Sequence, residues 1–280
     1  MTRKLLRTAA VSCALLMAAS SAVFTVNAAH DEKAAYSWYV RRAKDGNQPV
    51  CEPEMSFIEG YDAVYLDKSA DARGDKVLYL TFDAGYENGN VAKILDTLAS
   101  ENVPGAFFVL KNLIERDTEL VKRMANEGHM VVNHTLRHRD MTKFTDKALF
   151  TEELEGLNKL YKDAIGTDMP KFYRPPEGRF SEQNLKYASE LGYTTVFWSF
   201  AYADWDNDKQ PDPEEAKEKL RRNTHNGAVI LLHPTSATNA AILGDMIREW
   251  KAQGYRFGTL DELAHNNKMT KAADDDSATE

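Results

Sequence analysis

Cysteine is nearly absent from this chain of 280 residues, which contains only two. Two cysteines cannot build a disulfide scaffold, and Cys13 falls in the N-terminal leader described below, which leaves Cys51 alone. We assign Cys51 no role, because an unpaired cysteine is most often a small buried hydrophobic residue. Positive charge is also scarce, since the formal net charge is −8 at pH 7. A chain this acidic is a poor candidate for binding nucleic acid or an anionic lipid surface.

The glycine-rich loops that bind phosphate groups are missing as well. The segment after the first predicted strand, residues 85–89, has neither the lysine of a P-loop nor the glycine spacing of a dinucleotide-binding loop. No internal repeat is visible. Hydrophobic residues make up 43% and charged residues 28% of the chain, which excludes a disordered or a fibrous protein.

Charge is missing again from residues 8–29, an apolar run that follows three basic residues. Small side chains at 26–28 occupy the positions that a signal peptidase reads. We therefore expect residues 1–28 to be a cleaved signal peptide, and the mature chain, with net charge −8 − 3 = −11, to act outside the cytoplasmic membrane without spanning it. Because the run is long enough to cross a bilayer, an uncleaved anchor is the alternative.

Short β-branched or aromatic runs alternate with amphipathic helical stretches from residue 76 to residue 264. The predicted strands are 77–82, 105–110, 130–133, 171–173, 194–199, 228–232 and 255–257. The predicted helices are 90–100, 118–127, 147–164, 182–191, 213–223, 239–253 and 260–264. Each parallel crossover needs a covering helix, so this rhythm predicts a parallel sheet with helices outside it. The spacing favours an incomplete (β/α) barrel of about seven parallel strands over a doubly wound α/β sheet.

Two flanking segments fall outside this rhythm. Residues 29–75 are polar with embedded aromatic side chains such as Trp38 and Tyr65, and we expect them to form an ordered N-terminal extension packed on the barrel. Residues 265–280 have almost no apolar content and contain an acidic stretch, so we expect a disordered tail.

Polar side chains follow the predicted strands, at the end where a parallel barrel forms its site. They are Asp83 after the first strand, His134 and His138 after the third, Arg174, Pro176 and Glu177 after the fourth, Asp204 and Trp205 beyond the fifth, and His233 after the sixth. Carboxylates, imidazoles and one arginine are therefore expected at a single rim.

Each of these residues also has a purely structural interpretation. His134 and His138 are four residues apart, which on a helical turn lets both imidazoles chelate one cation, although such a pair is also common on a solvated helix face. Asp83 is either a helix cap or a catalytic group. Arg174 suits a structural salt bridge, and His233 suits a hydrogen-bonded core position.

Five motifs, taken in order, make the combination specific. They are Thr81-Phe82-Asp83, His134-Thr135-Leu136-Arg137-His138, Arg174-Pro175-Pro176, Asp204-Trp205 and Leu231-Leu232-His233. Over about residues 76–264, they resemble the polysaccharide deacetylase family, the NodB-homology domain of carbohydrate esterase family 4. Residues 81–90, 196–208, 231–240 and the segment 37–39 look most like the delta-lactam-biosynthetic de-N-acetylases of spore-forming bacteria.

The resemblance implies a role for each residue. Asp83 would be the general base that activates a water, and His233 the general acid for the leaving amine. Arg174 would hold the base, and Asp204 would orient His233. His134 and His138 would bind a divalent metal ion, zinc or another cation. Trp205, Pro176 and Glu177 would contact substrate, with a backbone N–H beside Glu177 stabilising the oxyanion.

Three positions depart from the family pattern. Ala84 stands where the family usually has a second aspartate that binds the metal, so we expect weak metal binding through two histidines. Glu177 stands where an aromatic residue is usual, and Ala201 where aspartate is frequent. Glu87 and Glu177 are the carboxylates nearest in sequence that could replace the missing ligand.

These inferences predict an exported hydrolase that removes the N-acetyl group from N-acetylmuramic acid in peptidoglycan glycan strands, on the route to muramic delta-lactam in the spore cortex. The first alternative is deacetylation of N-acetylglucosamine in peptidoglycan or chitin-like glycans. The second is a catalytically inactive glycan-binding protein, for which Ala84 is the argument. Retention of both an acid and a base favours an enzyme.

Overall fold

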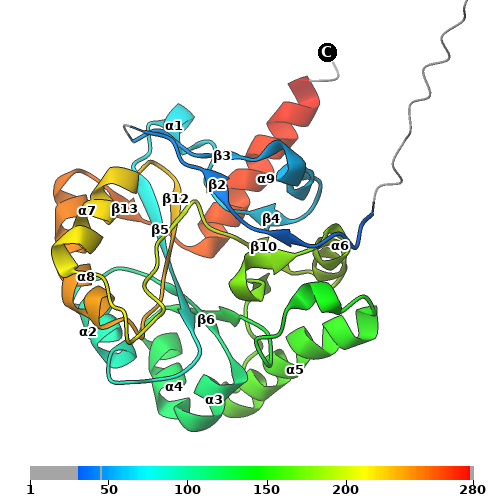
Figure 1. Cartoon of the computed structure of the whole chain (residues 1–280), viewed down its shortest axis with the longest axis horizontal. Coiled ribbons are helices and arrows are strands. Elements are labelled where there is room, and N and C mark those ends of the chain that lie inside the picture. Colours follow the sequence, from blue (N-terminus) through cyan, green and yellow to red (C-terminus); the bar gives the residue numbers. More distant parts are fainter. Residues whose placement is uncertain (1–30, 45, 278–280) are drawn as a thin grey trace, which may run out of the picture. The chain divides into compact units, whose positions relative to one another are not determined.

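A curled parallel sheet forms the centre of the molecule, which a computed structural model describes over residues 31–44 and 46–277 (Figure 1). The expected signal peptide, residues 1–28, lies outside these ranges. Nine strands form the sheet, in the order β11-β12-β5-β6-β7-β8-β10-β4, with β13 also paired to β5. Every named pair in this sheet is parallel. The predicted incomplete (β/α) barrel is confirmed.

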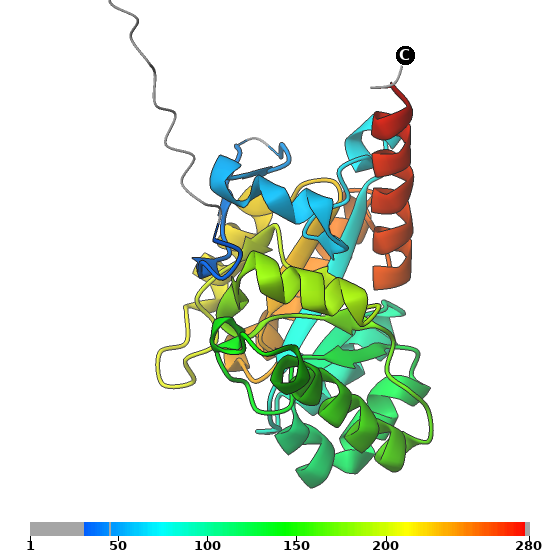
Figure 2. The ribbon, with the colours of Figure 1, turned by 90° about the vertical axis from the view of Figure 1, so that its right-hand side faces the viewer.

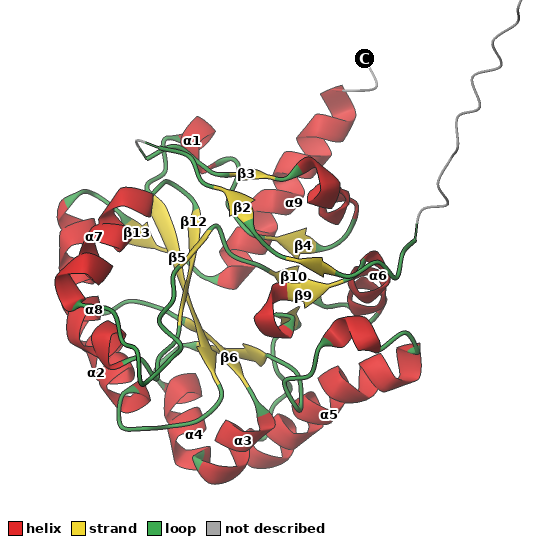
Figure 3. Cartoon of the chain, in the orientation of Figure 1, coloured by secondary structure: helices red, strands yellow, loops and turns green. Residues whose placement is uncertain are grey.

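The strands of this sheet are short apart from two central ones. Their bounds are β4 (Ala63–Val64), β5 (Val77–Ala84), β6 (Ala106–Val109), β7 (Met130–Asn133), β8 (Phe172–Tyr173), β10 (Thr194–Val196), β11 (Phe200–Ala201), β12 (Ala228–Leu232) and β13 (Arg256–Phe257). Helices surround the strands (Figure 3). These are α1 (Ala70–Arg73), α2 (Val91–Glu101), α3 (Lys111–Arg116), α4 (Thr118–Asn126), α5 (Lys147–Ile165), α6 (Glu182–Glu190), α7 (Pro213–Asn223), α8 (Ala237–Ala252) and α9 (Leu260–Ser277).

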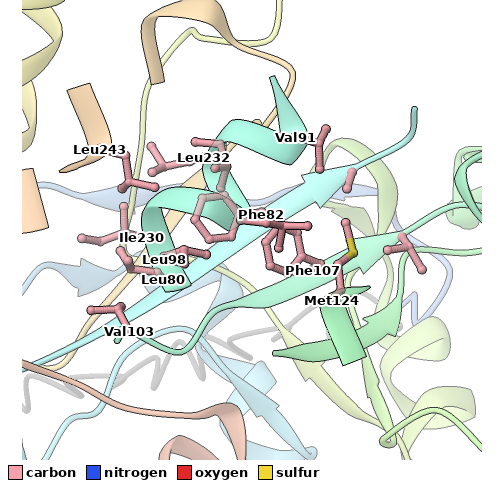
Figure 4. Packing of buried hydrophobic residues seen from close by; sticks show 14 of the residues in the cluster. Leu80, Phe82, Val91, Leu98, Val103, Phe107, Met124, Ile230, Leu232 and Leu243 are labelled. Atoms are coloured by element: carbon pink, nitrogen blue, oxygen red, sulfur yellow. The ribbon is translucent and has the colours of Figure 1, made fainter. Parts of the chain in front are cut away.

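Strand β5 shows how the sheet separates the helix layer from the barrel interior. Leu80 and Phe82 belong to the cluster that packs under α2 and α8, where the Phe82 ring stacks on Phe107 with centroids 4.8 Å apart (Figure 4). Tyr79 belongs to a second cluster inside the barrel. Because side chains alternate along a strand, Asp83 continues the interior face, whereas Ala84 joins the helix-facing cluster.

The N-terminal extension is built onto one side of the barrel. Its strand β1 (Tyr36–Ser37) pairs antiparallel with β9 (Arg179–Phe180), β2 (Val40–Arg41) pairs with β3 (Val50–Cys51), and β4 continues the main sheet beside β10. A 3-10 segment, Pro53–Gly60, lies between β3 and β4. The Trp38 ring stacks on Phe197 with centroids 4.4 Å apart. The thiol of Cys51 is buried, and this burial raises its pKa to about 11.

One prediction about order is wrong. The segment expected to be disordered from residue 265 onward continues helix α9 as far as Ser277. Leu263 at the start of that helix is buried in the barrel cluster, and the Asn266 amide donates to Asp67 at 2.8 Å. A helix anchored at one end extends at low cost per residue, so its polar continuation stays helical. The view in Figure 2 shows α9 projecting beyond the barrel.

Candidate active site

A cavity of about 790 Å³ opens at the carboxyl ends of the barrel strands. Six of the predicted site residues and several others line it: Asp83, Gly85, Tyr86, Leu110, Asn112, His134, His138, Glu177, Trp198, Ala201, Tyr202, Trp205, Leu231, His233 and Thr235. Arg174 and Asp204 are not among the lining residues, and they contact Asp83 and His233 from behind this wall. Pro176 is buried and is not among the lining residues.

Asp83 at the end of β5 is the buried carboxylate of the site. Its Oδ1 accepts a hydrogen bond from Arg174 Nη1 at 2.7 Å, and its Oδ2 lies 3.5 Å from His134 Nε2. Burial opposes ionisation of this carboxyl, but the positive charge around it outweighs burial and holds the pKa of Asp83 below its ordinary value. Asp83 is therefore ionised at neutral pH, with one oxygen directed toward the cavity.

Arg174 is fully buried, and each nitrogen of its guanidinium donates a hydrogen bond. Besides Asp83, it donates to the Val196 carbonyl at 3.0 Å and to Thr81 Oγ1 at 2.9 Å. The guanidinium carbon also lies 3.9 Å from the centroid of the Phe108 ring. The predicted salt bridge exists, but its carboxylate partner is the candidate base, so the structural and the functional interpretations of Arg174 coincide.

His134 is held in one tautomer by the backbone. Its Nδ1 lies 3.0 Å from the Arg174 carbonyl, which can only accept, so Nδ1 carries the proton and Nε2 presents a lone pair toward Asp83. Burial lowers the pKa of His134 to about 4, and the imidazole is therefore neutral at neutral pH. A neutral, oriented imidazole is the form that binds a metal ion.

The two histidines meet, although not on a helical turn as the spacing suggested. Residues 134–140 form a loop in which Thr135 and His138 both have positive φ, at 73° and 54°. The Thr135 hydroxyl accepts from the His138 backbone N–H at 3.0 Å and so stabilises the reversal. The ring centroids of His134 and His138 are 5.0 Å apart. A tight loop brings the two imidazoles together instead of a helix.

Within the part of the chain that the structure describes, the two imidazoles are not joined by a third side chain into a metal site. Over the described ranges, no group of three histidine, cysteine or acidic side chains is arranged to hold a metal ion. Ala84 packs in the helix-facing apolar cluster, and the carboxylate of Glu87 accepts from the backbone amides of Gly89 and Ala92 at the start of α2. The imidazoles of His134 and His138 therefore fit one divalent cation, and the remaining ligands must come from solvent or substrate.

His233 directly follows β12, the strand paired with β5, so it lies on the same rim as Asp83, and it has a carboxylate partner of its own. Its Nδ1 donates to Asp204 Oδ1 at 2.7 Å, and its backbone N–H donates to Asp204 Oδ2 at 2.8 Å. Burial by itself lowers the pKa of His233, but the hydrogen bond and charge of Asp204 outweigh it, so the pKa is raised above its ordinary value. This imidazole can hold a proton on Nε2 near neutral pH and deliver it.

The edge of the cavity carries the remaining predicted contacts. Trp205 is 61% exposed and its ring lies edge-on to His233, with centroids 6.1 Å apart. Glu177 is exposed and adopts a left-handed conformation with φ 56°. Sequence reasoning did not find the lining residues Tyr86, Asn112 and Trp198, because none of these types signals chemistry without a known fold.

Comparison with known proteins identifies the family to which this fold belongs. The polysaccharide deacetylase family matches residues 70–196. The peptidoglycan-N-acetylmuramic acid deacetylase PdaA of Bacillus subtilis is 38% identical over 234 residues, which are 83% of this chain and 87% of that protein. This chain belongs to the polysaccharide deacetylase family. The structure of PdaA, described as a family 4 carbohydrate esterase, superimposes with a TM-score of 0.78 over 82% of this chain and 97% of that one.

Two further relatives show the breadth of the match within this family. A peptidoglycan-N-acetylglucosamine deacetylase of Bacillus cereus is 35% identical, covering 69% of this chain and 70% of that protein. The structure of a family 4 carbohydrate esterase from Bacillus anthracis is 32% identical, with a TM-score of 0.68 over 84% of this chain and 98% of that one. The deacetylase described here is therefore a hydrolase of carbon–nitrogen bonds other than peptide bonds. In the part of the chain that the structure describes, no helix is long and apolar enough to cross a membrane.

Proposed function

We propose that this deacetylase is exported and removes the N-acetyl group of N-acetylmuramic acid in peptidoglycan, on the route to muramic delta-lactam in spore cortex. One observation in the structure supports the proposed hydrolysis. The Asp83–Arg174 pair and the Asp204–His233 pair face one cavity from β5 and β12, the base and the acid that amide hydrolysis requires. The match to PdaA over 83% of the chain supports the choice of sugar.

In the proposed reaction, Asp83 Oδ2 takes a proton from a water whose oxygen attacks the acetyl carbon. Arg174 keeps the carboxylate charged and in place. The C–N bond then breaks while His233 Nε2 transfers its proton to the sugar nitrogen, so acetate and a free amine leave. The backbone N–H of Glu177, in the left-handed turn 176–178, is the proposed donor to the oxygen that becomes negative.

His134 and His138 would hold a divalent cation, which polarises the acetyl oxygen when it is bound. The fixed tautomer of His134 and its low pKa suit that role. With two protein ligands, the site is expected to hold the cation weakly.

The N-terminal extension holds part of the wall of the cavity in which the sugar would bind. The Trp38 indole N–H donates to the Trp198 carbonyl at 2.8 Å, and the Trp38 backbone N–H donates to the Gly178 carbonyl at 2.8 Å. These bonds fix both Trp198 and the turn that carries Glu177. Muramic acid has a lactyl group beside its acetamide, and a cavity of about 790 Å³ has room for a substituted sugar.

Deacetylation of N-acetylglucosamine is the second candidate, favoured by the relative from Bacillus cereus. The test is acetate release by the protein from peptide-free peptidoglycan strands and from chitin oligomers, with Asp83→Asn as the inactive control. We expect faster release from peptidoglycan strands. Faster release from chitin oligomers would contradict the muramic acid assignment and leave the family activity intact.

A further inference from the structure

Asp204 has a third hydrogen-bond donor besides the two from His233. The side-chain amide of Asn239 donates to Asp204 Oδ2 at 2.6 Å and to the His233 carbonyl at 3.1 Å. Both Asn239 and Asp204 are 1% exposed. A buried carboxylate needs such donors, and Oδ2 is thereby occupied by Asn239 and the His233 backbone N–H. Oδ1 is left to face the imidazole.

The orientation of the Asn239 amide is itself fixed. Its Oδ1 accepts a hydrogen bond from the hydroxyl of Tyr202, a buried residue that also lines the cavity. Burial and the charge of Asp204 raise the pKa of Tyr202, so the phenol stays neutral and can donate. With Oδ1 engaged by Tyr202, the NH₂ group must point at Asp204 and His233.

Asn239 does not serve as the cap of its own helix. It lies in the first turn of α8, where Ser236 is the N-cap and its hydroxyl accepts from the Asn239 backbone N–H at 3.1 Å. The side-chain amide of Asn239 therefore bonds to Asp204 and His233 instead of capping the helix. The backbone of the Asp204 loop is tied separately, by Gln210, whose amide donates to the Asp204 carbonyl at 3.1 Å.

We propose that Asn239, oriented by Tyr202, is a positioning residue that holds the Asp204 carboxylate in the rotation in which it orients and charges His233. This rests on the proposed role of His233 as the general acid. Without the amide, one lone pair of a buried carboxylate has no donor, and the carboxylate can turn away from the imidazole. The acid is then both misoriented and less basic.

The charged groups around His233 set the sign of the expected shift. Asp204 from the loop after β11 and Asp83 from β5 favour its protonated form, whereas Arg174 after β8 disfavours it. Only the Asp204 contribution depends on Asn239, because Asn239 bonds Asp204, whereas Asp83 and Arg174 pair with each other. If the Asp204 carboxylate is no longer held in place, the pKa of His233 is therefore expected to fall.

The test is a titration of His233 by NMR in the protein without substrate, assigned by the missing resonance in His233→Asn. We expect Asn239→Leu, which keeps the volume and removes both donors, to lower the titration midpoint. It should also lower kcat about tenfold or more while leaving KM unchanged, with the alkaline limb of the kcat profile moved to lower pH. Tyr202→Phe should shift both in the same direction by a smaller amount.

Ser236→Ala is the matched control from the same helical turn. It removes the helix cap and the hydrogen bond from the Ser236 hydroxyl to Gln210 Oε1. It is expected to lower Tm without moving the His233 titration, because Gln210 still donates to the Asp204 carbonyl through its amide nitrogen. If Asn239→Leu lowers only Tm and leaves the titration and the alkaline limb unchanged, or moves them upward, the positioning role is wrong. Because the titration needs no turnover, it stays informative even if the protein releases no acetate from peptidoglycan, which would contradict the proposed function instead.

Discussion

Two aspartates lie at opposite ends of the barrel, one fully buried and one with a side chain 11% exposed, and each pairs with an arginine. Asp67, near the amino ends of the strands, accepts hydrogen bonds from Ser69, Arg73, Tyr79 and Asn266 with both carboxylate oxygens engaged. At the carboxyl ends, Asp83 receives Arg174 on Oδ1, while Oδ2 faces His134 and the cavity.

The difference separates a structural ion pair from the ion pair that we propose to be catalytic. Asp67 joins the loop after β4 to α1, β5 and α9, and its side chain is fully buried, so its charge stabilises the fold. Asp83 lines the cavity, and the proposed mechanism places a water beside its Oδ2. Burial and an arginine partner are common to both, and the free lone pair beside a cavity is what distinguishes the reactive carboxylate.

The strongest test of this comparison is Asp83→Asn. The amide keeps an oxygen for Arg174 but cannot accept a proton, so we expect acetate release to fall about 1,000-fold or more. The protein should remain folded, because Arg174 retains Thr81 and the Val196 carbonyl as acceptors. Near-native turnover in a folded variant would remove Asp83 from the mechanism.

The proposed acid, His233, is tested by Asp204→Asn. This change removes the charge that raises the pKa of His233, so the alkaline limb of the kcat profile should move to lower pH and kcat should fall about 100-fold. The sign follows because an acid must be protonated to act, and a lower pKa loses the proton earlier as pH rises. An unchanged alkaline limb would show that another group is the acid.

Asp67→Asn should produce the reverse pattern of Asp83→Asn. We expect a loss of about 3 kcal/mol of unfolding free energy, with activity per folded molecule unchanged. Burial opposes ionisation of Asp67, but hydrogen bonds from Arg73, Asn266 and Tyr79 outweigh it and lower its pKa. Its charge therefore stabilises the fold above the unfolded-state pKa, and this contribution disappears as pH falls through the folded-state pKa.

Denaturant unfolding of wild type and Asp67→Asn at pH 7 and near pH 3 measures this difference. The gap between the two proteins should be larger at pH 7. A loss of activity with unchanged stability would break the distinction between the two ends of the barrel.

The smallest expected effect concerns the metal. Titration calorimetry with Zn²⁺ should show weak binding to the wild type, about tenfold or more weaker binding to His134→Ala, and an unchanged affinity in Asp67→Asn. Equal affinity in wild type and His134→Ala would mean that these imidazoles are not the metal site.

The bounds of several central strands and helices could be predicted from the sequence, because buried residues give a clear pattern of apolar side chains. Strand β7, strand β12 and helix α7 begin and end where they were expected, because apolar runs and an Asp-Pro helix start are local signals. Strand β4 is two residues long and helix α3 six, too short for any periodicity to show.

The site could be located from strand ends, but its geometry could not. The motif order placed Asp83 and His233 on one rim, whereas the positive φ of His138 and the contact of Asn239 with Asp204 depend on tertiary structure. Asparagine in the first turn of a helix is an ordinary sequence feature, so its link to His233 became visible only in the fold.

The most direct measurement for the central claim is mass spectrometry of peptidoglycan digested after incubation with the protein, before and after removal of the stem peptides. We predict that acetyl groups disappear from muramic acid residues with the wild type and persist with Asp83→Asn. Acetyl groups lost only from glucosamine residues, or retained on both sugars with a folded and metal-supplied protein, would contradict it.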